Sequence, residues 1–305
     1  MNKMVQNKHN SKLFLSLILI TILITPTISA SAKRFKKHDS IEEHIISENV
    51  IRFEEKISLN IPPEYSMELP EGAYYKVNIY GIDVGDGVVL IDCGDENYVK
   101  NLYKSVSKAF KKPVIAVYLT HGHADHAGGG AYFQRKGVPV YSHFFEAPLI
   151  EAGASDPAYP APDQFFYTGY TPDYIDENAE EEEGFSIIHT PGHTMGSVSI
   201  SYNSDCGSYL FTGDAIFETP STDPLDFSFT LSWYTAYQLW DLSNSNGYPD
   251  FIGIWTNTVS YLGLIVPDID IICPGHATEY PNISASSYLG LTSLILENLP
   301  NISSL

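Results

Sequence analysis

Short apolar runs rich in β-branched and aromatic residues recur along the chain. They are too short for typical helices and are bounded by glycine, proline and polar residues, so we interpret them as buried strands. They cover residues 88–91, 113–120, 137–141, 185–190, 208–212 and 270–273. No repeat and no Gly/Ser linker divides them, which predicts one large α/β domain.

Two segments between these runs are long enough to be insertions. Residues 151–184 are dense in proline, tyrosine and acid, and residues 218–263 are rich in tryptophan and tyrosine. In the second, side chains at helical spacing predict an amphipathic helix. Its apolar face either packs against the core, which is the commoner use, or lines a substrate pocket. The side chains are Leu231, Trp233, Tyr234, Tyr237, Gln238 and Trp240.

The amino terminus has the organisation of a secretory signal. Three lysines precede an apolar stretch over residues 13–24, and Ala30-Ser-Ala32 offers small residues for cleavage. The stretch is shorter than the about 20 residues of a membrane span. We expect a secreted, extracytoplasmic protein that begins at Lys33; an uncleaved signal would anchor it to the membrane. The predicted division is 1–32 signal, 33–70 arm and first strands, 71–285 main domain, and 286–305 carboxy-terminal helix or tail.

Acidic residues dominate the charge. The chain has 37 Asp and Glu against 17 Lys and Arg, a formal net charge of −20, and loss of three lysines and no acid with residues 1–32 would change it to −23. Nucleic acids are bound through clusters of Lys and Arg, and the basic run here is confined to residues 33–37. The composition argues against a nucleic-acid partner and suits a protein kept soluble by its charge.

Cysteine usage excludes a disulfide scaffold. The chain has Cys93, Cys206 and Cys273, an odd number, so at most one disulfide forms within it. We expect Cys93 and Cys273 to be small buried core residues.

Three imidazoles and a carboxylate occupy the six residues His121-Gly-His-Ala-Asp-His126, directly after the run 113–120. This density indicates a metal site, the alternative being a solvated His-rich loop. Residues two apart on a helix point about 200° apart, and neighbours on a strand face opposite sides. An irregular turn is therefore expected, with Asp125 and His126 serving a different ion from His121 and His123.

Three further ligand-type residues follow predicted strands after a glycine or Pro-Gly. A glycine there lets the backbone turn sharply and approach an ion. Each residue alone is typical of a structural position, but with the first motif they make an ordered set of seven ligands. They are His193, Asp214 and His276.

From Leu90-Ile-Asp-Cys-Gly94 to His276, the chain resembles the metallo-β-lactamase superfamily. The resemblance implies a four-layer αβ/βα sandwich with a metal pair at one edge. By this resemblance, one metal would be bound by His121, His123 and His193, the other by Asp125, His126 and His276, with Asp214 bridging the two.

The donor set suits two divalent ions. Imidazole and carboxylate favour zinc and also suit iron or manganese. Two ions about 3.5–4 Å apart lower the pKa of a shared water toward 7 and polarise a carbonyl or phosphoryl oxygen. We expect a bridging hydroxide to attack, with Asp125 as both ligand and orienting group that shares the general-base role with the metal.

Two neighbours of the motifs have other expected roles. Asp92 follows the run 88–91 and either accepts a hydrogen bond from a metal-binding imidazole or forms a turn before Cys93-Gly94. His189, in the pattern His-Thr-Pro-Gly-His, is interpreted as structural.

The predicted function is hydrolysis of an ester, lactone, thioester or amide bond in a small molecule. Thr212-Gly-Asp-Ala215 resembles acyl-homoserine lactonases, which favours a lactone or another ester. Many zinc β-lactamases lack an Asp at the position of Asp214, which disfavours that activity. Iron-dependent oxidoreductases of the same superfamily are an alternative, although the diiron reductases have Glu where this chain has His123. A non-catalytic metal-binding protein is another alternative, against which the complete ligand set argues.

Overall fold

The computed structural model describes residues 41–59, 69–153, 166–175, 184–218, 220–244, 248–276 and 285–302. The predicted signal segment 1–32 lies outside the described residues. None of the described helices is long and apolar enough to cross a membrane.

The first sheet has seven strands in the order β1 to β7. β1 to β4 pair antiparallel, whereas β4 to β7 pair parallel and are joined by segments that contain helices. β2 pairs with β3 along its whole length, so strands from the segment 33–70 belong to this sheet. The strands are β1 (Glu42–Ile45), β2 (Val50–Ser58), β3 (Tyr74–Asp83), β4 (Val88–Ile91), β5 (Val114–Tyr118), β6 (Val140–Ser142) and β7 (Asp173–Tyr174).

The second sheet has four strands in the order β11-β10-β9-β8. β8, β9 and β10 form an antiparallel meander, and β11 returns to pair parallel with β10. The strands are β8 (Phe185–His189), β9 (Val198–Ser204), β10 (Gly207–Gly213) and β11 (Ile271–Pro274).

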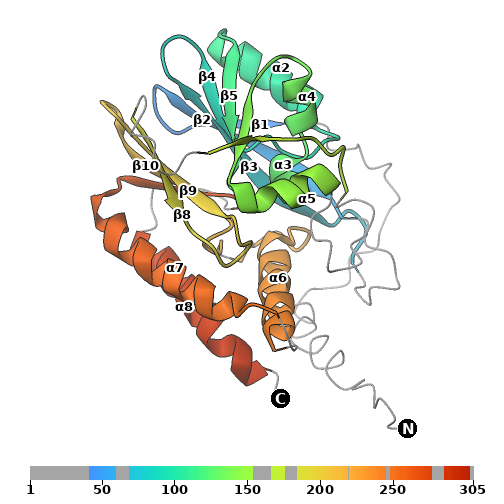
Figure 1. Cartoon of the computed structure of the whole chain (residues 1–305), viewed down its shortest axis with the longest axis vertical. Helices are drawn as coiled ribbons and strands as arrows, with labels where there is room; N and C mark the ends of the chain where they lie inside the picture. Colours follow the sequence, from blue (N-terminus) through green and yellow to red (C-terminus); the bar gives the residue numbers. More distant parts are fainter. Residues whose placement is uncertain are drawn as a thin grey trace.

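Helices cover the outer faces of both sheets (Figure 1). α2 (Val99–Phe110), α4 (Gly130–Gln134) and α5 (Ala147–Ala152) lie against the first sheet, and α7 (Phe251–Ile265) and α8 (Ala285–Ile302) lie against the second. α6 (Ser228–Ser243) packs on α7 and α8. Shorter elements are α3 (Ala124–Ala127), η2 (Phe144–Glu146) and η4 (Val266–Asp268).

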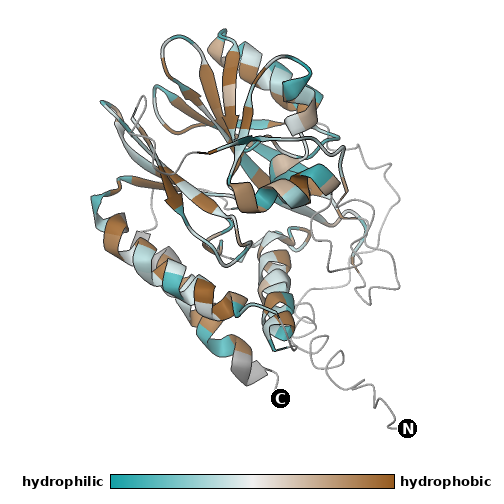
Figure 2. Cartoon of the chain, viewed as in Figure 1, coloured by the Kyte–Doolittle hydropathy of each residue, from teal (hydrophilic) through white to brown (hydrophobic). Residues whose placement is uncertain are grey.

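The two sheets and the helices on their outer faces make four layers, and an apolar cluster fills each of the three spaces between them. One packs the first sheet on α2 and α4, a second fills the space between the sheets, and a third joins β10 and β11 to α6, α7 and α8. Successive side chains of a strand point to opposite faces of the sheet, so one strand provides apolar side chains to two clusters. Val77 and Ile79 of β3 face the helices, and Tyr80 and Ile82 face the second sheet. Apolar residues accordingly concentrate in the strands, and polar residues on the outer side of α2 (Figure 2). The arrangement confirms the predicted αβ/βα sandwich.

The predicted elements are present. All six predicted strands occur, and α8 occupies most of the segment 286–305. α6 confirms the helix predicted around residues 231–240, but its buried side chains are Ser228, Ala236 and Leu239, while Trp233 and Trp240 are only half-buried. Trp233, Tyr237 and Trp240 still pack against the apolar cluster that joins α6 to α7 and α8, so the expected packing of the aromatic face against the core is confirmed, although these side chains are less buried than Ala236 and Leu239.

The three cysteines are free thiols. Cys93 and Cys273 are buried, as predicted, and Cys206 is exposed. Burial raises the pKa of the Cys93 thiol well above its usual range, which keeps this thiol protonated.

Candidate metal centre

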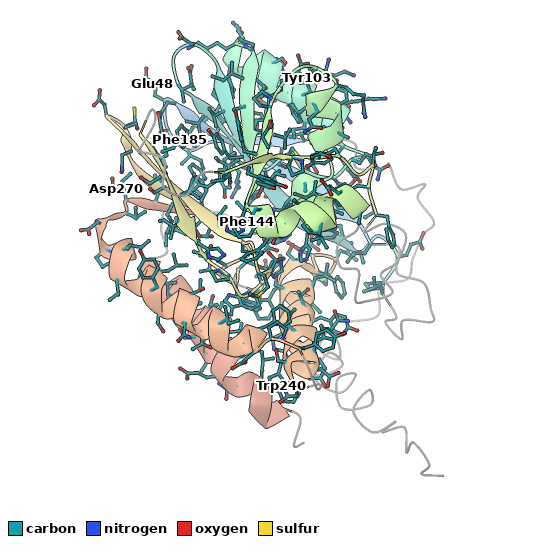
Figure 3. All side chains as sticks on the ribbon, viewed as in Figure 1. Glu48, Tyr103, Phe144, Phe185, Trp240 and Asp270 are labelled. Carbon is teal, nitrogen blue, oxygen red and sulfur yellow. The ribbon has the colours of Figure 1, made fainter. Side chains whose placement is uncertain are left out.

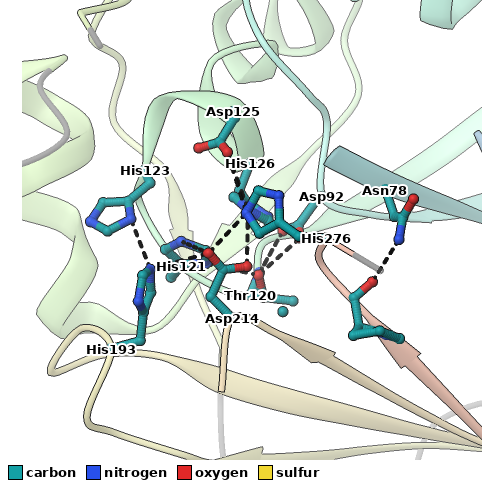
Figure 4. Close-up of polar contacts among 12 residues, drawn as sticks. Asn78, Asp92, Thr120, His121, His123, Asp125, His126, His193, Asp214 and His276 are labelled. Atoms are coloured by element: carbon teal, nitrogen blue, oxygen red, sulfur yellow. Dashed lines mark hydrogen bonds and ion pairs between the residues drawn. The ribbon is translucent and has the colours of Figure 1, made fainter. Parts of the chain in front are cut away.

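The seven predicted ligands converge at one edge of the sandwich, where strands of both sheets end (Figure 4). β4 and β5 run parallel, so Asp92 and His121 leave the first sheet at the same edge; β10 and β11 are also parallel and bring Asp214 and His276 together. His193 comes from the loop between β8 and β9.

His121, His123 and His193 form a first group, whose ligand atoms lie within 4.8 Å of one another. His193 Nε2 lies 2.9 Å from His123 Nδ1. Burial lowers the pKa of His123 to about 4 and of His193 to about 3, and it lowers the pKa of His121 well below the ordinary value. All three imidazoles are therefore neutral at pH 7 and have lone pairs to offer to a cation.

Asp125, His126 and His276 form a second group. His276 Nε2 lies 3.3 Å from His126 Nε2 and 3.5 Å from Asp125 Oδ2. Burial lowers the pKa of both imidazoles, but the charges of Asp214 and Asp125 outweigh it, so the pKa of His276 rises to about 10 and that of His126 also rises. Without a cation these imidazoles hold protons, which a metal ion would displace.

Asp214 lies between the two groups. Its Oδ2 is 3.3 Å from His193 Nε2 and 3.0 Å from His276 Nε2, and its Oδ1 is 3.3 Å from His126 Nε2. Burial raises the pKa of Asp214, but the surrounding imidazoles outweigh it and hold the pKa well below the ordinary value. Gly275 admits this carboxylate, because a Cβ there would lie 2.3 Å from Asp214 Oδ1.

Outer contacts fix which nitrogen of each imidazole faces inward. His126 Nδ1 donates to Asp92 Oδ2 at 2.7 Å, and His276 Nδ1 donates to the carbonyl of Lys76. Carboxylates and carbonyls only accept here, so Nδ1 of each imidazole carries a proton, and Nε2 is the nitrogen that would bind a cation once its own proton is displaced. The contact expected between Asp92 and a ligand imidazole is confirmed. The Lys76 carbonyl was missed, because a backbone group leaves no signal in a sequence.

Asp92 is held by several bonds in an uncommon backbone conformation. It has φ 65°, which a non-glycine residue rarely adopts. Asp92 Oδ1 accepts the Thr120 N–H at 2.7 Å, and Asp92 Oδ2 accepts the Thr120 hydroxyl at 2.9 Å. This pair of residues ties the end of β4 to the end of β5, next to His121.

The donor set fits divalent cations. His121 Nε2 is buried and has no hydrogen-bond partner among the described residues. Leaving a buried acceptor unpaired costs about 1–3 kcal/mol. A cation would pair this nitrogen, and imidazole with carboxylate suits zinc, iron or manganese.

The backbone around the motif differs from the expected irregular turn. His123 is extended (φ −68°, ψ 154°), and Asp125 and His126 lie on the single helical turn α3. The extended residue separates His121 and His123 from the helical pair, so the chain still directs two predicted ligands to each group. The expected irregular turn is therefore confined to residues 121–123, and the placement of Asp125 and His126 on a helical turn corrects the prediction.

His189 lies apart from the cluster. Its Nε2 donates to the Met195 carbonyl at 2.9 Å, and its ring stacks on His143 with centroids 4.5 Å apart. Its interpretation as a structural residue is confirmed.

Comparisons with known proteins agree with this geometry. The family model described as the metallo-beta-lactamase superfamily matches residues 74–276. A probable metallo-hydrolase of Streptococcus pyogenes is 28% identical over 163 residues, covering 48% of this chain and 62% of that protein. A metallo-beta-lactamase type 2 of Bacillus cereus is 27% identical over 137 residues, covering 45% of this chain and 52% of that protein. The matches thus span about half to two thirds of these relatives.

The fold is similar to solved structures. A metallo-beta-lactamase from Pontibacter korlensis superposes with a TM-score of 0.57 at 19% identity, covering 85% of this chain and all (100%) of that one. At this level of identity the likeness establishes the fold.

Proposed function

The chain belongs to the metallo-β-lactamase superfamily, and from that premise we propose that it is a metal-dependent hydrolase of a small molecule. The observation that carries the proposal is the convergence of seven side chains into two groups that share Asp214. The bond that it cleaves belongs to the ester, lactone, thioester or amide class, and the motif Thr212-Gly-Asp-Ala215 favours a lactone or another ester.

Each group would hold one divalent cation, with His121, His123 and His193 around the first and Asp125, His126 and His276 around the second. Asp214 would bind both. The cations, zinc in our proposal, would supply a shared water acidified to a bridging hydroxide and a Lewis acid that polarises the bond under attack.

Asp125 would have a second role. Its Oδ2 lies 3.5 Å from His276 Nε2 and 3.7 Å from His126 Nε2, and its side chain is partly accessible. A carboxylate held beside the attacking water orients it by accepting a hydrogen bond and receives a proton as the substrate reacts.

Metal analysis together with a substrate panel tests the proposal. The purified protein should contain about two divalent ions per chain and should hydrolyse at least one lactone, ester, thioester or amide, with β-lactams and phosphodiesters as further arms. Asp83→Asn, at the end of β3 that is remote from the seven proposed ligands, is the control for ligand variants and should retain both ions and activity. A protein that binds no ions after reconstitution, or turns over only in redox assays, would contradict the proposal.

Export is a separate proposal that rests on the pattern of residues 1–32. Sequencing the amino terminus of protein recovered outside the cytoplasm should give Lys33 as the first residue. Full-length protein retained in the cytoplasm would contradict export without affecting the proposed chemistry.

A further inference from the structure

Glu146 is a buried carboxylate at the end of η2, directly before α5, and it is 2% exposed. It lies outside the two groups of proposed ligands, yet both of its oxygens accept backbone N–H groups. Oε2 accepts from Gly122 at 2.7 Å, and Oε1 accepts from Gly196 at 2.8 Å. Phe144, two residues earlier and labelled in Figure 3, is exposed, in contrast to Glu146.

These two glycines belong to the two loops that carry the first group. Gly122 separates His121 from His123, and Gly196 follows His193 by three residues. The loops come from different sheets, and their bases are already joined by a 2.8 Å bond from the Val198 N–H to the Thr120 carbonyl. Glu146 fastens the same loops at a second point, next to the imidazoles.

The glycines leave only enough room for this carboxylate. A Cβ on Gly196 would lie 2.6 Å from Glu146 Oε1, and a Cβ on Gly122 would lie 3.0 Å from Oε2. On the other side of the first loop, the Tyr167 hydroxyl donates to the Gly122 carbonyl at 2.7 Å. Both backbone groups of Gly122, its N–H and its carbonyl, are therefore held by buried side chains.

We infer that Glu146 is a positioning residue that sets the separation between His193 and the pair His121 and His123, and so tunes the affinity of this group for its cation. The inference rests on the proposed function. One rigid side chain that accepts a bond from each loop fixes their spacing, and hydrogen bonds to a carboxylate are stronger than those to neutral acceptors. Spacing matters because imidazole nitrogens must lie within about 0.2 Å of their ideal distance from the ion.

Glu146→Gln tests the inference with almost no change of shape. The amide has one oxygen and one NH₂, so one of the two backbone N–H groups would face a donor. We expect the full-chain variant to bind Co²⁺ about tenfold more weakly at one of its two sites, a loss typical of outer contacts. The other site should keep its affinity, and the visible spectrum of the Co²⁺ form should change.

Leu102→Ala is the control for a general loss of stability. Leu102 is a fully buried residue of α2, remote from both loops, and truncation there destabilises the fold through a cavity. It should lower the urea midpoint and leave both Co²⁺ affinities and the spectrum as in the wild type.

If Glu146→Gln does not fold, Gly196→Ala is the second variant. Its added methyl group would push the Glu146 carboxylate away from the Gly196 N–H and should weaken only the Co²⁺ site of His121, His123 and His193. Unchanged affinity and spectrum in a folded variant would overturn the inference, as would an equal loss at both sites. A wild type that binds no Co²⁺ would overturn the proposed function as well, whereas a wild type with two sites and an unaffected variant would overturn only the role of Glu146.

Discussion

Asp92→Asn should weaken the second group of proposed ligands and leave the first group intact. Asp92 accepts three hydrogen bonds, from His126 Nδ1 and from the N–H and hydroxyl of Thr120, at 2.7, 2.7 and 2.9 Å. Asparagine keeps the shape and is among the few residues that tolerate φ 65°. The substitution therefore removes an acceptor and a charge without imposing backbone strain.

The size of the effect follows from the bond between Asp92 and His126. Both side chains are buried, and their contact is short. The amide has one oxygen and one NH₂, so in the variant either the Thr120 N–H or the His126 Nδ1–H faces a donor. Where the NH₂ faces His126, the imidazole loses its acceptor or moves its proton to Nε2, where it would block the cation. Loss of a hydrogen bond to a charged group costs about 1.5–3 kcal/mol, which corresponds to a metal affinity that is roughly 10- to 100-fold weaker.

The assay is competition between the protein and a chromophoric chelator for Zn²⁺, fitted to two sites. One site should weaken in Asp92→Asn, and the other should keep its wild-type affinity. Asp83→Asn is the matched control, because Asp83 also accepts a backbone N–H, from Gly85 at 2.9 Å, but it ends β3 and pairs with Val88, at the opposite end of β4 from Asp92.

Wild-type affinity at both sites in a folded Asp92→Asn variant would refute the reasoning. So would the same loss in Asp83→Asn, because the effect would then belong to a general change of charge. A loss of affinity confined to the site of His121, His123 and His193 would show that the contact between Asp92 and His126 supports that site and not the second one.

Three further predictions test other parts of the molecule. His123→Ala should abolish turnover and lower the bound metal in elemental analysis; full activity in this variant would refute the assigned centre. Asp214→Asn should release both ions to a chelator more readily than His193→Ala, because its carboxylate contacts both groups, and equal release would argue against a bridge. Burial raises the pKa of Glu218 to about 7 from the ordinary value of 4.5. The folded state then keeps a proton that the unfolded chain has lost, so stability should fall between pH 4.5 and 7. Glu218→Gln should remove this loss of unfolding free energy, about 3 kcal/mol, when urea titrations are compared across this pH range. The same dependence of stability on pH in wild type and variant would contradict a raised pKa of Glu218.

Local patterns in the sequence were sufficient for six of the described strands and for the identity of the clustered side chains, but not for strands such as β3 and β9. β4 occupies residues 88–91, as its apolar run predicts, and each of His193, Asp214 and His276 follows a strand that was recognised from its own residues. Such features are encoded locally, because apolar composition and the glycine turn act over only a few neighbouring positions. The resemblance to a known family added the grouping of the ligands, and the structure brings the same trios together.

Other features depend on how the two sheets pack. The Lys76 carbonyl reaches His276, which is 200 positions away, and Glu146 reaches Gly196, which is 50 positions away. Neither partner carries a motif, and one of them is a backbone group common to every residue. The sequence by itself determined which side chains can bind metal and where the chain turns to present them. Only the tertiary structure decided which nitrogen of each imidazole faces inward and what holds the loops apart, because those contacts form between segments that become neighbours when the sheets pack.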